Sequence, residues 1–390
     1  MDEMRLCGWS AYQSHRVPPV VRAIAQAFHD AGHPTADGHL DGHPSLIGVD
    51  KPLCIMADTP NKRLRSASHV SLLRSRIGDG DFAPHPAAGP SAPLVTHPAA
   101  TLLTLAPTLS VARLALAAAE TLGSFSIFQP SPDMQMALDQ LQIEAGEMPP
   151  ITVSRGASAY QPLLSISDLD HSTRHDLAMA WRYGGWRQVR DTKGSPTSLW
   201  RRSPLVSPGE LVAYLREHQG EHGSTRLGKA ISITASGAAS PLEAQACLLL
   251  CSSRRRGGEA LGSPACNARV ELTPEAAAIA RQGRCYCDLL LKGRRSSVLV
   301  DIECQGLVAH DGQERRLSDS DRSMALRCMG IDVLFLTHHV LASPVACAEF
   351  ARKARKLLGV EELELSPGLL AKREQLRREA LVNWNTFGIS

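Results

Sequence analysis

The chain has few aromatic residues, little net charge and no long uninterrupted apolar run. Phe, Trp and Tyr make up 4% of its 390 residues, which argues against an extended platform for stacking nucleic-acid bases. The formal net charge of +3 is too small to indicate nucleic-acid binding by itself. The longest apolar zone, Ala92–Ala119, is interrupted by His97, Pro98, Pro107 and Arg113. We therefore expect no transmembrane helix.

Two further signals are missing, a secretion signal and the cysteine spacing of a zinc finger. Met1–Arg5 is followed by no apolar segment of the kind found in signal peptides. We therefore expect a cytoplasmic protein whose ten cysteines are reduced thiols, most of them small core residues. The pairs Cys285-x-Cys287 and Cys247-xxx-Cys251 lack the ligand spacing of a structural zinc site.

The length and the apolar content predict more than one folded domain. A chain of 390 residues with 43% apolar residues is long enough for two or three domains with their own cores. A small-residue segment, Thr234–Ser240, marks the boundary that we expect before the last large domain. The predicted domains are residues 1–128, a mixed α+β domain; 129–236, a linker with a small helical region; 237–360, an α/β domain; and 361–390, a charged helix.

Residues 1–128 contain two predicted helices and a run of histidines. Val17–His29 is a short amphipathic helix that tolerates prolines at its start. His97–Leu122 has leucines and alanines at helical spacing, with a possible break at Pro107. Four histidines occur in one stretch and suggest a metal site or, more simply, a solvated loop, because their spacing defines no single face; they are His29, His33, His39 and His43.

The segment Pro130–Ser207 has weak periodicity and no clear element. It contains Trp181, Trp186 and Trp200 among several arginines. An aromatic and basic surface of this kind can bind nucleic acid. Ordinary core tryptophans are the favoured alternative.

The pattern after residue 236 is much clearer. A helix begins with Ser240 as the N-cap, Pro241 at the first position and Glu243 at the third, which is the capping-box arrangement. Further elements follow in the order strand, strand, strand, helix, strand, helix, helix; they are predicted at Asn267–Leu272, Tyr286–Leu291, Val298–Cys304, Ser318–Met329, Ile331–Thr337, Ala342–Leu358 and Ser366–Asn383.

The second and third of these strands form a predicted β-hairpin around the basic turn Lys292–Arg295. Asp288 lies on the first strand of the hairpin. Because side chains alternate along a strand, Asp301, Glu303 and Gln305 share one face of the second strand. An acidic face at the end of an otherwise apolar strand favours a cleft.

The order of these residues resembles the PD-(D/E)xK nuclease superfamily, and in particular the group related to the very-short-patch repair endonuclease. The resemblance covers about residues 236–345 and implies an α/β fold with a restriction-endonuclease-like α-β-β-β-α-β core, here preceded by a mixed α+β N-terminal domain. The matching segments are Ser240–Glu243 (SPLE), Asp288-Leu289, Asp301–Gly306 (DIECQG), His310, Asp319–Arg322 (DSDR) and Gly330–Thr337 (GIDVLFLT).

The resemblance implies a metal-dependent endonuclease that acts on DNA, in phage defence, a toxin–antitoxin system or DNA repair. Asp288 and Glu303 would hold Mg²⁺ or Mn²⁺, because such ions prefer carboxylate oxygens and water. Gln305 stands where the family usually has a lysine, and an amide can orient water but cannot take its proton. His310 is the substitute general base, and Glu243 orients a water or the metal.

Arginines near this predicted site are candidate phosphate ligands. Arg322 begins the following helix, and Arg294 and Arg295 lie in the hairpin turn. Simpler interpretations exist: Glu243 is a helix cap and His310 is surface. A catalytically inactive DNA-binding or regulatory protein is the alternative function, and the charged helix Ala371–Asn383 is a possible contact for a protein partner.

The N-terminal region resembles, more loosely, the antitoxin-like domain of abortive-infection type IV systems. The segments concerned are Cys7–Pro19, Pro52–Leu72 with Arg63 and His69, and His97–Leu103. The resemblance implies a defence or mobile-element component.

Overall fold

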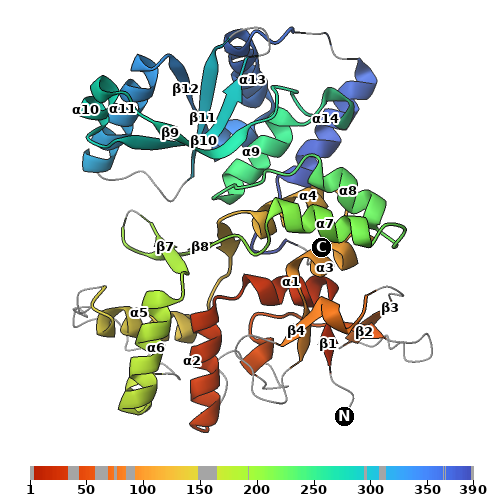
Figure 1. Cartoon of the computed structure of the whole chain (residues 1–390), viewed down its shortest axis with the longest axis vertical. Coiled ribbons are helices and arrows are strands. Elements are labelled where there is room, and N and C mark those ends of the chain that lie inside the picture. The colour runs from red at the N-terminus through yellow and green to blue at the C-terminus, as the bar shows by residue number, and fades with distance from the viewer. Residues whose placement is uncertain are drawn as a thin grey trace. The chain divides into compact units, whose positions relative to one another are not determined.

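The computed structural model describes residues 4–33, 44–57, 69–73, 77–84, 93–147, 165–191, 193–293, 297–306, 313–362, 364 and 366–387. The fold is α/β, as predicted, with helices and mixed sheets (Figure 1). The chain divides into two compact units that interleave along the sequence. Unit 1 comprises residues 1–105, 126–188 and 198–203, and unit 2 comprises residues 106–125, 189–197 and 204–390.

The described residues of unit 1 form a five-stranded sheet and five α-helices. The sheet has the order β3-β2-β1-β5-β4. Its strands are β1 Arg5–Leu6, β2 Leu53–Ala57, β3 His69–Leu73, β4 Phe82–Pro84 and β5 Leu94–Thr96. The helices are α1 Gly8–Arg16, α2 Pro19–Asp30, α3 Pro98–Leu105, α5 Pro132–Glu144 and α6 His171–Tyr183.

A hydrophobic core of unit 1 forms between α2, α5 and α6. Phe28 and Leu138 are buried there together with Trp181 and Trp200. The two indole rings meet edge to face with centroids 6.2 Å apart, and Trp200 is 0% exposed. The hypothesis of an aromatic nucleic-acid surface is therefore wrong for these two tryptophans, and the core interpretation is confirmed. Trp186 is partly buried against the same core.

The predicted helix over residues 97–122 is two helices, α3 and α4 Val111–Leu122, with the break around Pro107 as expected. Proline lacks the N–H of a helix interior, and Ser110 then caps α4 by accepting a hydrogen bond from Arg113 N. Whereas α3 belongs to unit 1, α4 is part of unit 2 and is buried over almost its whole length. It packs there against α8 Ser224–Ile231, α9 Pro241–Cys251 and α14 Pro367–Ala380.

Unit 2 is built around a four-stranded sheet of order β12-β11-β10-β9. The strands are β9 Ala265–Glu271, β10 Arg284–Lys292, β11 Leu299–Gln305 and β12 Ile331–Thr337. Neighbours are antiparallel except β11 and β12, which are parallel and joined through α11 Gln313–Cys328. The remaining helices are α7 Pro208–Glu217, α10 Pro274–Ala280, α12 His338–Ala342 and α13 Pro344–Leu358.

Helices cover both faces of this sheet. Leu326 of α11 packs on one face, against Leu299, Ile331 and Val333. On the other face α9 and α13 contact β11 (Figure 1). The predicted hairpin of β10 and β11 is present, with Leu290 opposite Asp301.

A third sheet has the order β6-β8-β7, formed by β6 Phe125–Ile127, β7 Arg187–Arg190 and β8 Pro196–Arg201.

Several element boundaries differ from the sequence-based expectations. The predicted helix over residues 342–358 is present as α13, which begins two residues later at Pro344, and a separate short helix, α12, ends at Ala342 just before it. The segment 130–207, where no element is predicted, contains α5, α6, β7 and β8. Thr234–Ser240, predicted as a domain boundary, lies within unit 2, and Ala235, Ala238 and Ala239 in it are buried.

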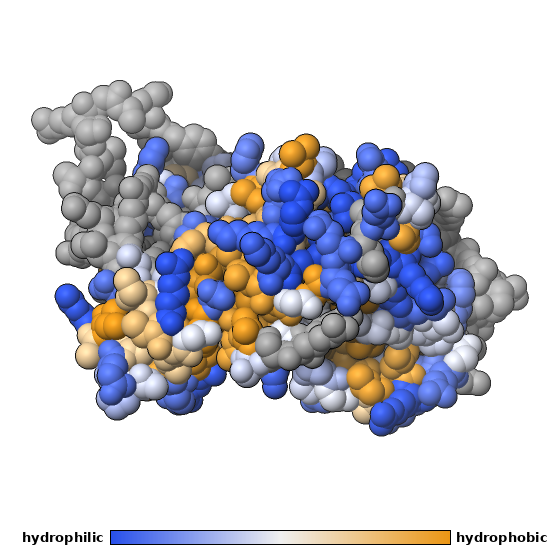
Figure 2. All heavy atoms as spheres, turned by 90° about the horizontal axis from the view of Figure 1, so that it is seen from above, coloured by the Kyte–Doolittle hydropathy of each residue, from blue (hydrophilic) through white to orange (hydrophobic). Residues whose placement is uncertain are grey.

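The ten cysteines are free thiols, and half of them are buried. Figure 2 shows polar and charged side chains interspersed with apolar ones over the face that it draws. In the described part of the chain, no helix combines the length and the apolar character needed to cross a bilayer.

Candidate active site

Glu243 lies at the start of α9 and is held as a helix cap. Ser240 accepts from Glu243 N at 3.2 Å, and its hydroxyl donates to Glu243 Oε1 at 2.7 Å. Glu243 Oε2 accepts from Ala239 N at 2.7 Å and from Asn267 Nδ2 at 3.0 Å. The side chain is 3% exposed. Glu243 therefore caps this helix start, but it accepts from Ala239 N and not from Ser240 N as in the predicted capping box. The contacts occupy both of its carboxylate oxygens.

Asp288 lies where the ladder around β10 is interrupted. Cys287 pairs with Ala268 and Leu289 with Cys266, so the residue opposite Asp288 is Asn267. Asn267 has φ of 49°, a left-handed conformation that favours short polar residues such as Asn. It donates to Gly237 O at 2.8 Å as well as to Glu243. A local bend of this kind re-aims side chains, as β-bulges do beside active sites.

Pairing with β11 also changes at Asp288. The register runs from Lys292 opposite Leu299 to Leu289 opposite Ile302. After this last pair the main-chain pairing stops, and Asp288 Oδ2 accepts a hydrogen bond from Cys304 N at 2.8 Å. The carboxylate thus replaces a main-chain acceptor and lies beside the backbone of the residue that follows Glu303.

Glu303 and Asp301 lie on the α11 face of β11, as the alternation predicts. Glu303 is 5% exposed and Asp301 is 0% exposed. Arg322 of α11 donates to Glu303 Oε2 at 2.5 Å. Glu303 Oε1 and both carboxyl oxygens of Asp301 are buried without a hydrogen-bond partner in normal geometry among the described residues. The predicted phosphate ligand Arg322 is therefore paired with an acid.

Burial raises the pKa of both acids on this face. For Glu303, burial and then the neighbouring carboxylates of Asp288 and Asp301 raise the pKa to about 10, while Arg322 acts in the opposite direction. Burial likewise raises the pKa of Asp301. Asp288, Asp301 and Glu303 thus lie close enough to affect one another, with Arg322 as the opposing charge. The raised pKa means that this cluster tends to retain a proton.

The carboxyl oxygens are of the kind that a hard cation binds, but too few of them come together to form a complete metal site. Among the described residues, no group of three or more His, Cys, Asp or Glu side chains is arranged to hold a metal ion. Mg²⁺ nevertheless needs only one or two protein carboxylates, with water completing its octahedral shell. The buried oxygen Glu303 Oε1 has no partner among the described residues, and Asp288 is half-buried. Whether Asp288 and Glu303 hold an ion together stays a prediction, whereas Glu243 is occupied by its cap.

Several predicted site residues lie at the edge of what the structure describes. Gln305 ends β11, is partly exposed and stands opposite Thr337 of β12. His310, Arg294 and Arg295 lie outside the described residues, so their proposed roles stay predictions. Sequence reasoning missed Asn267. Asn267 lies between two apolar strand residues, and Asn is rare in strands. This position could have indicated a special role for Asn267.

The predicted histidine cluster of unit 1 falls partly outside the described residues, which do not include His39 and His43. His29 Nδ1 lies 3.4 Å from Asp30 Oδ1. The ring of His33 meets Phe28 edge to face. These contacts are ordinary for a helix end and give no support to a metal site.

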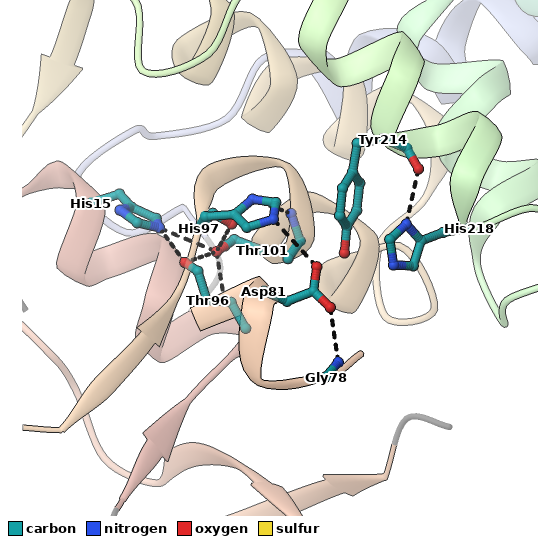
Figure 3. Close-up of polar contacts among 9 residues, drawn as sticks. His15, Gly78, Asp81, Thr96, His97, Thr101, Tyr214 and His218 are labelled. Atoms are coloured by element: carbon teal, nitrogen blue, oxygen red, sulfur yellow. Dashed lines mark hydrogen bonds and ion pairs between the residues drawn. The ribbon is translucent and has the colours of Figure 1, made fainter. Parts of the chain in front are cut away.

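A separate polar cluster of unit 1 joins α1, β5 and α3 (Figure 3). His15 Nε2 donates to Thr96 O at 2.8 Å and lies 3.2 Å from Thr101 Oγ1. His97 Nδ1 accepts from Ala100 N at 3.3 Å, and its Nε2 lies 3.3 Å from Asp81 Oδ1. Both ring nitrogens of His97 are therefore engaged in capping α3 and binding Asp81. The cluster stabilises the fold and leaves neither nitrogen of His97 as a base.

Comparisons with known proteins give no relative: no protein family, curated protein or solved structure matches this chain.

Proposed function

We propose that residues 237–360 are a metal-dependent DNA endonuclease domain of the PD-(D/E)xK type, which hydrolyses phosphodiester bonds. The observation that carries the proposal is the hydrogen bond from Cys304 N to Asp288 Oδ2 at 2.8 Å. It fixes the Asp288 carboxylate beside Glu303 at the point where the pairing of β10 and β11 changes.

The order of the elements supports the proposal. From α9 the chain runs through β9, β10 and β11 to α11 and β12, with the short α10 inserted after β9. The first three strands are antiparallel neighbours, and β12 joins beside β11 in parallel. Apart from the inserted α10, this order is compatible with the α-β-β-β-α-β core that the sequence resemblance implies, and it supports the proposal to that extent.

Each residue then has a defined task in the proposed reaction. Asp288 and Glu303 hold the metal ion, which when bound supplies a polarised water and offsets the charge of the phosphate. Gln305, at the partly exposed end of β11, orients that water through its amide. Glu243 is a positioning residue, because it holds the Asn267 side chain opposite Asp288. His310 is assigned the proton transfer.

A second candidate function is a DNA-binding protein that keeps the fold without cleavage. The Arg322–Glu303 ion pair favours it, because the guanidinium occupies one oxygen of a carboxylate that the metal requires. Gln305 favours it too, since an amide cannot accept the proton of the attacking water.

A nicking assay on supercoiled plasmid DNA with Mg²⁺ or Mn²⁺ separates the two candidates. The endonuclease proposal predicts cleavage by the wild-type chain and a loss of about 100-fold or more in Asp288→Asn, which removes the charge but keeps an acceptor for Cys304 N. Asp332→Asn is the matched control, because Asp332 is an exposed acid on the same sheet and should leave the rate unchanged.

The outcomes are distinct. Salt-dependent DNA binding without nicking selects the second candidate. Equal nicking by wild type and Asp288→Asn contradicts the proposed site, and absence of both binding and nicking contradicts both functions.

A further inference from the structure

Unit 2 contains a pocket that the proposed nuclease site does not use. Its volume is about 400 Å³, which lies within the usual range of small-molecule sites. The C-terminal half of α9 contributes Cys247 and Cys251, and β9 contributes Cys266. The segment Ser232–Ser236 and the loop that follows α9 also line it.

The polar groups of this pocket are suited to an anion. Among its described lining residues, Arg256 carries the one formal charge. A guanidinium has five N–H donors, and one amino group of Arg256 donates to Lys229 O at 3.1 Å. Ser252 also lines the pocket and is 5% exposed. Its Oγ is enclosed without a hydrogen-bond partner among the described residues, a state that costs free energy, and it reaches a ligand only after rotation about χ1 turns it toward the pocket.

The thiols make the remaining wall neutral and soft. A hydrogen bond with Cys251 and burial raise the pKa of Cys247 well above its ordinary value. A hydrogen bond with Cys247 and burial raise the pKa of Cys266 likewise, and the carboxylates of Glu243 and Asp288 add to the effect. Neutral thiols behave as small apolar surfaces. Because those carboxylates lie near Cys266, the anionic group of a ligand belongs at the Arg256 end.

We propose that this pocket binds a small organic oxyanion, with its phosphate or carboxylate group on Arg256 and Ser252 and its apolar body against the three thiols. A bare oxyanion leaves most of the volume unfilled, whereas an anion with a ring-sized body also covers the Cys247 and Cys251 side chains. The site is independent of the endonuclease proposal and stands whether or not the chain cleaves DNA.

Protection of Cys251 from alkylation tests the proposal on the full chain. Cys251 is half-buried in the pocket, whereas Cys328 is exposed on α11 and is absent from the pocket lining. The alkylation of both cysteines by iodoacetamide is followed by peptide mass spectrometry, with Cys328 as the internal reference. The probes are phenyl phosphate, benzoate and inorganic phosphate, which separate a phosphate group, a carboxylate group and the bare oxyanion.

A probe at about ten times its Kd should slow the alkylation of Cys251 about tenfold relative to Cys328, because roughly one molecule in eleven stays free. Arg256→Gln should abolish the protection, and Ser252→Ala should weaken it without removing a charge. Arg255→Gln is the matched control, because Arg255 is exposed in the same turn and is absent from the pocket lining.

Protection by any of the three probes that is lost in Arg256→Gln and kept in Arg255→Gln supports the proposal. The proposal is overturned if no probe protects Cys251, or if Arg256→Gln and Ser252→Ala both protect as well as the wild type. Thermal unfolding without a probe shows whether either variant is folded, so a loss of protection through unfolding is recognised.

Discussion

At the scale of single residues, Asp301 is the most informative acid in unit 2. It is 0% exposed, and its oxygens have no hydrogen-bond partner in normal geometry among the described residues. The alternation of β11 predicts that it shares a face with Glu303. The sequence could not predict that α11 would place Arg322 on Glu303 and leave Asp301 without its own cation, because that depends on how a helix packs on the sheet.

This cluster has more carboxyl groups than cations, which predicts that the stabilisation of the fold by Mg²⁺ depends on pH. The pKa of Glu303 is raised from 4.5 to about 10, so the folded chain keeps a proton that the unfolded chain releases. Stability therefore falls as the pH rises from 4.5 toward 10. On the proposed metal site, Mg²⁺ would displace that proton, so its stabilising effect on thermal unfolding should be larger at the upper end of this window than near pH 6.

Glu303→Gln is the control for this prediction, since it removes the titrating group, which is also one of the two proposed metal ligands. The variant should show little stabilisation by Mg²⁺ at either pH. A wild-type shift in melting temperature that is the same at both pH values would contradict the linkage.

His15 predicts the opposite trend for unit 1. Burial lowers its pKa from 6.5 to about 4, so the unfolded chain takes up a proton that the folded chain excludes. Stability should fall as the pH falls from 6.5 to 4, by up to about 3 kcal/mol. His15→Gln, which can still donate to Thr96 O, should flatten this dependence in urea unfolding. His175→Gln, at an exposed site on α6, should not.

At the scale of elements, local capping signals predict helix starts well. Ser240 and Ser366 are N-caps followed by proline, as expected, and both accept hydrogen bonds from the third helical residue. Ser131, the N-cap of α5, is also followed by proline. No helix is predicted there, because the apolar residues of that segment show only weak periodicity. Asp170 caps α6 without a proline, so its signal is weaker still.

The break at Asp288 could not be predicted from sequence. It depends on the left-handed backbone of Asn267 and on a side chain that replaces a main-chain partner of Cys304. Both follow from the pairing of strands that are distant in sequence. Periodicity therefore predicts the hairpin and its faces, but not the place where its strands separate.

The cap of α9 predicts a structural cost for removing Glu243. Glu243→Ala leaves Ala239 N and Asn267 Nδ2 without their acceptor, so we expect a loss of about 1–3 kcal/mol in the free energy of unfolding. Glu243→Gln keeps one acceptor oxygen and should lose less. If Glu243→Ala has wild-type stability in urea unfolding, the capping role is wrong.

At the scale of the whole molecule, unit 2 is held together by contacts between distant segments. Glu259 follows α9 and is 4% exposed. It forms ion pairs with Arg355 of α13 and with Arg373 of α14, the latter at 2.8 Å. The predicted charged C-terminal helix thus packs onto its own unit, and Leu376 and Ala380 are buried there. Whether it also binds a partner stays a prediction.

Removing this acid should destabilise unit 2 strongly. Glu259→Ala leaves two arginines without their shared carboxylate, one of them 7% exposed, and we expect a loss of about 3–5 kcal/mol in denaturant unfolding. Glu349→Ala breaks the exposed pair with Arg352 and should change the stability far less, because solvent screens such a pair. Similar losses for the two variants would show that the buried pair is not a major contribution to stability.

The packing of α4 also has a consequence for the growing chain at the ribosome. This alanine- and leucine-rich helix leaves the exit tunnel early, whereas α14, which covers part of it, is made roughly 250 residues later. At translation rates of about 5–20 residues per second, that interval lasts on the order of tens of seconds. During it the apolar surface of α4 lacks its native cover, so the nascent chain should be a substrate for chaperones that bind exposed apolar segments.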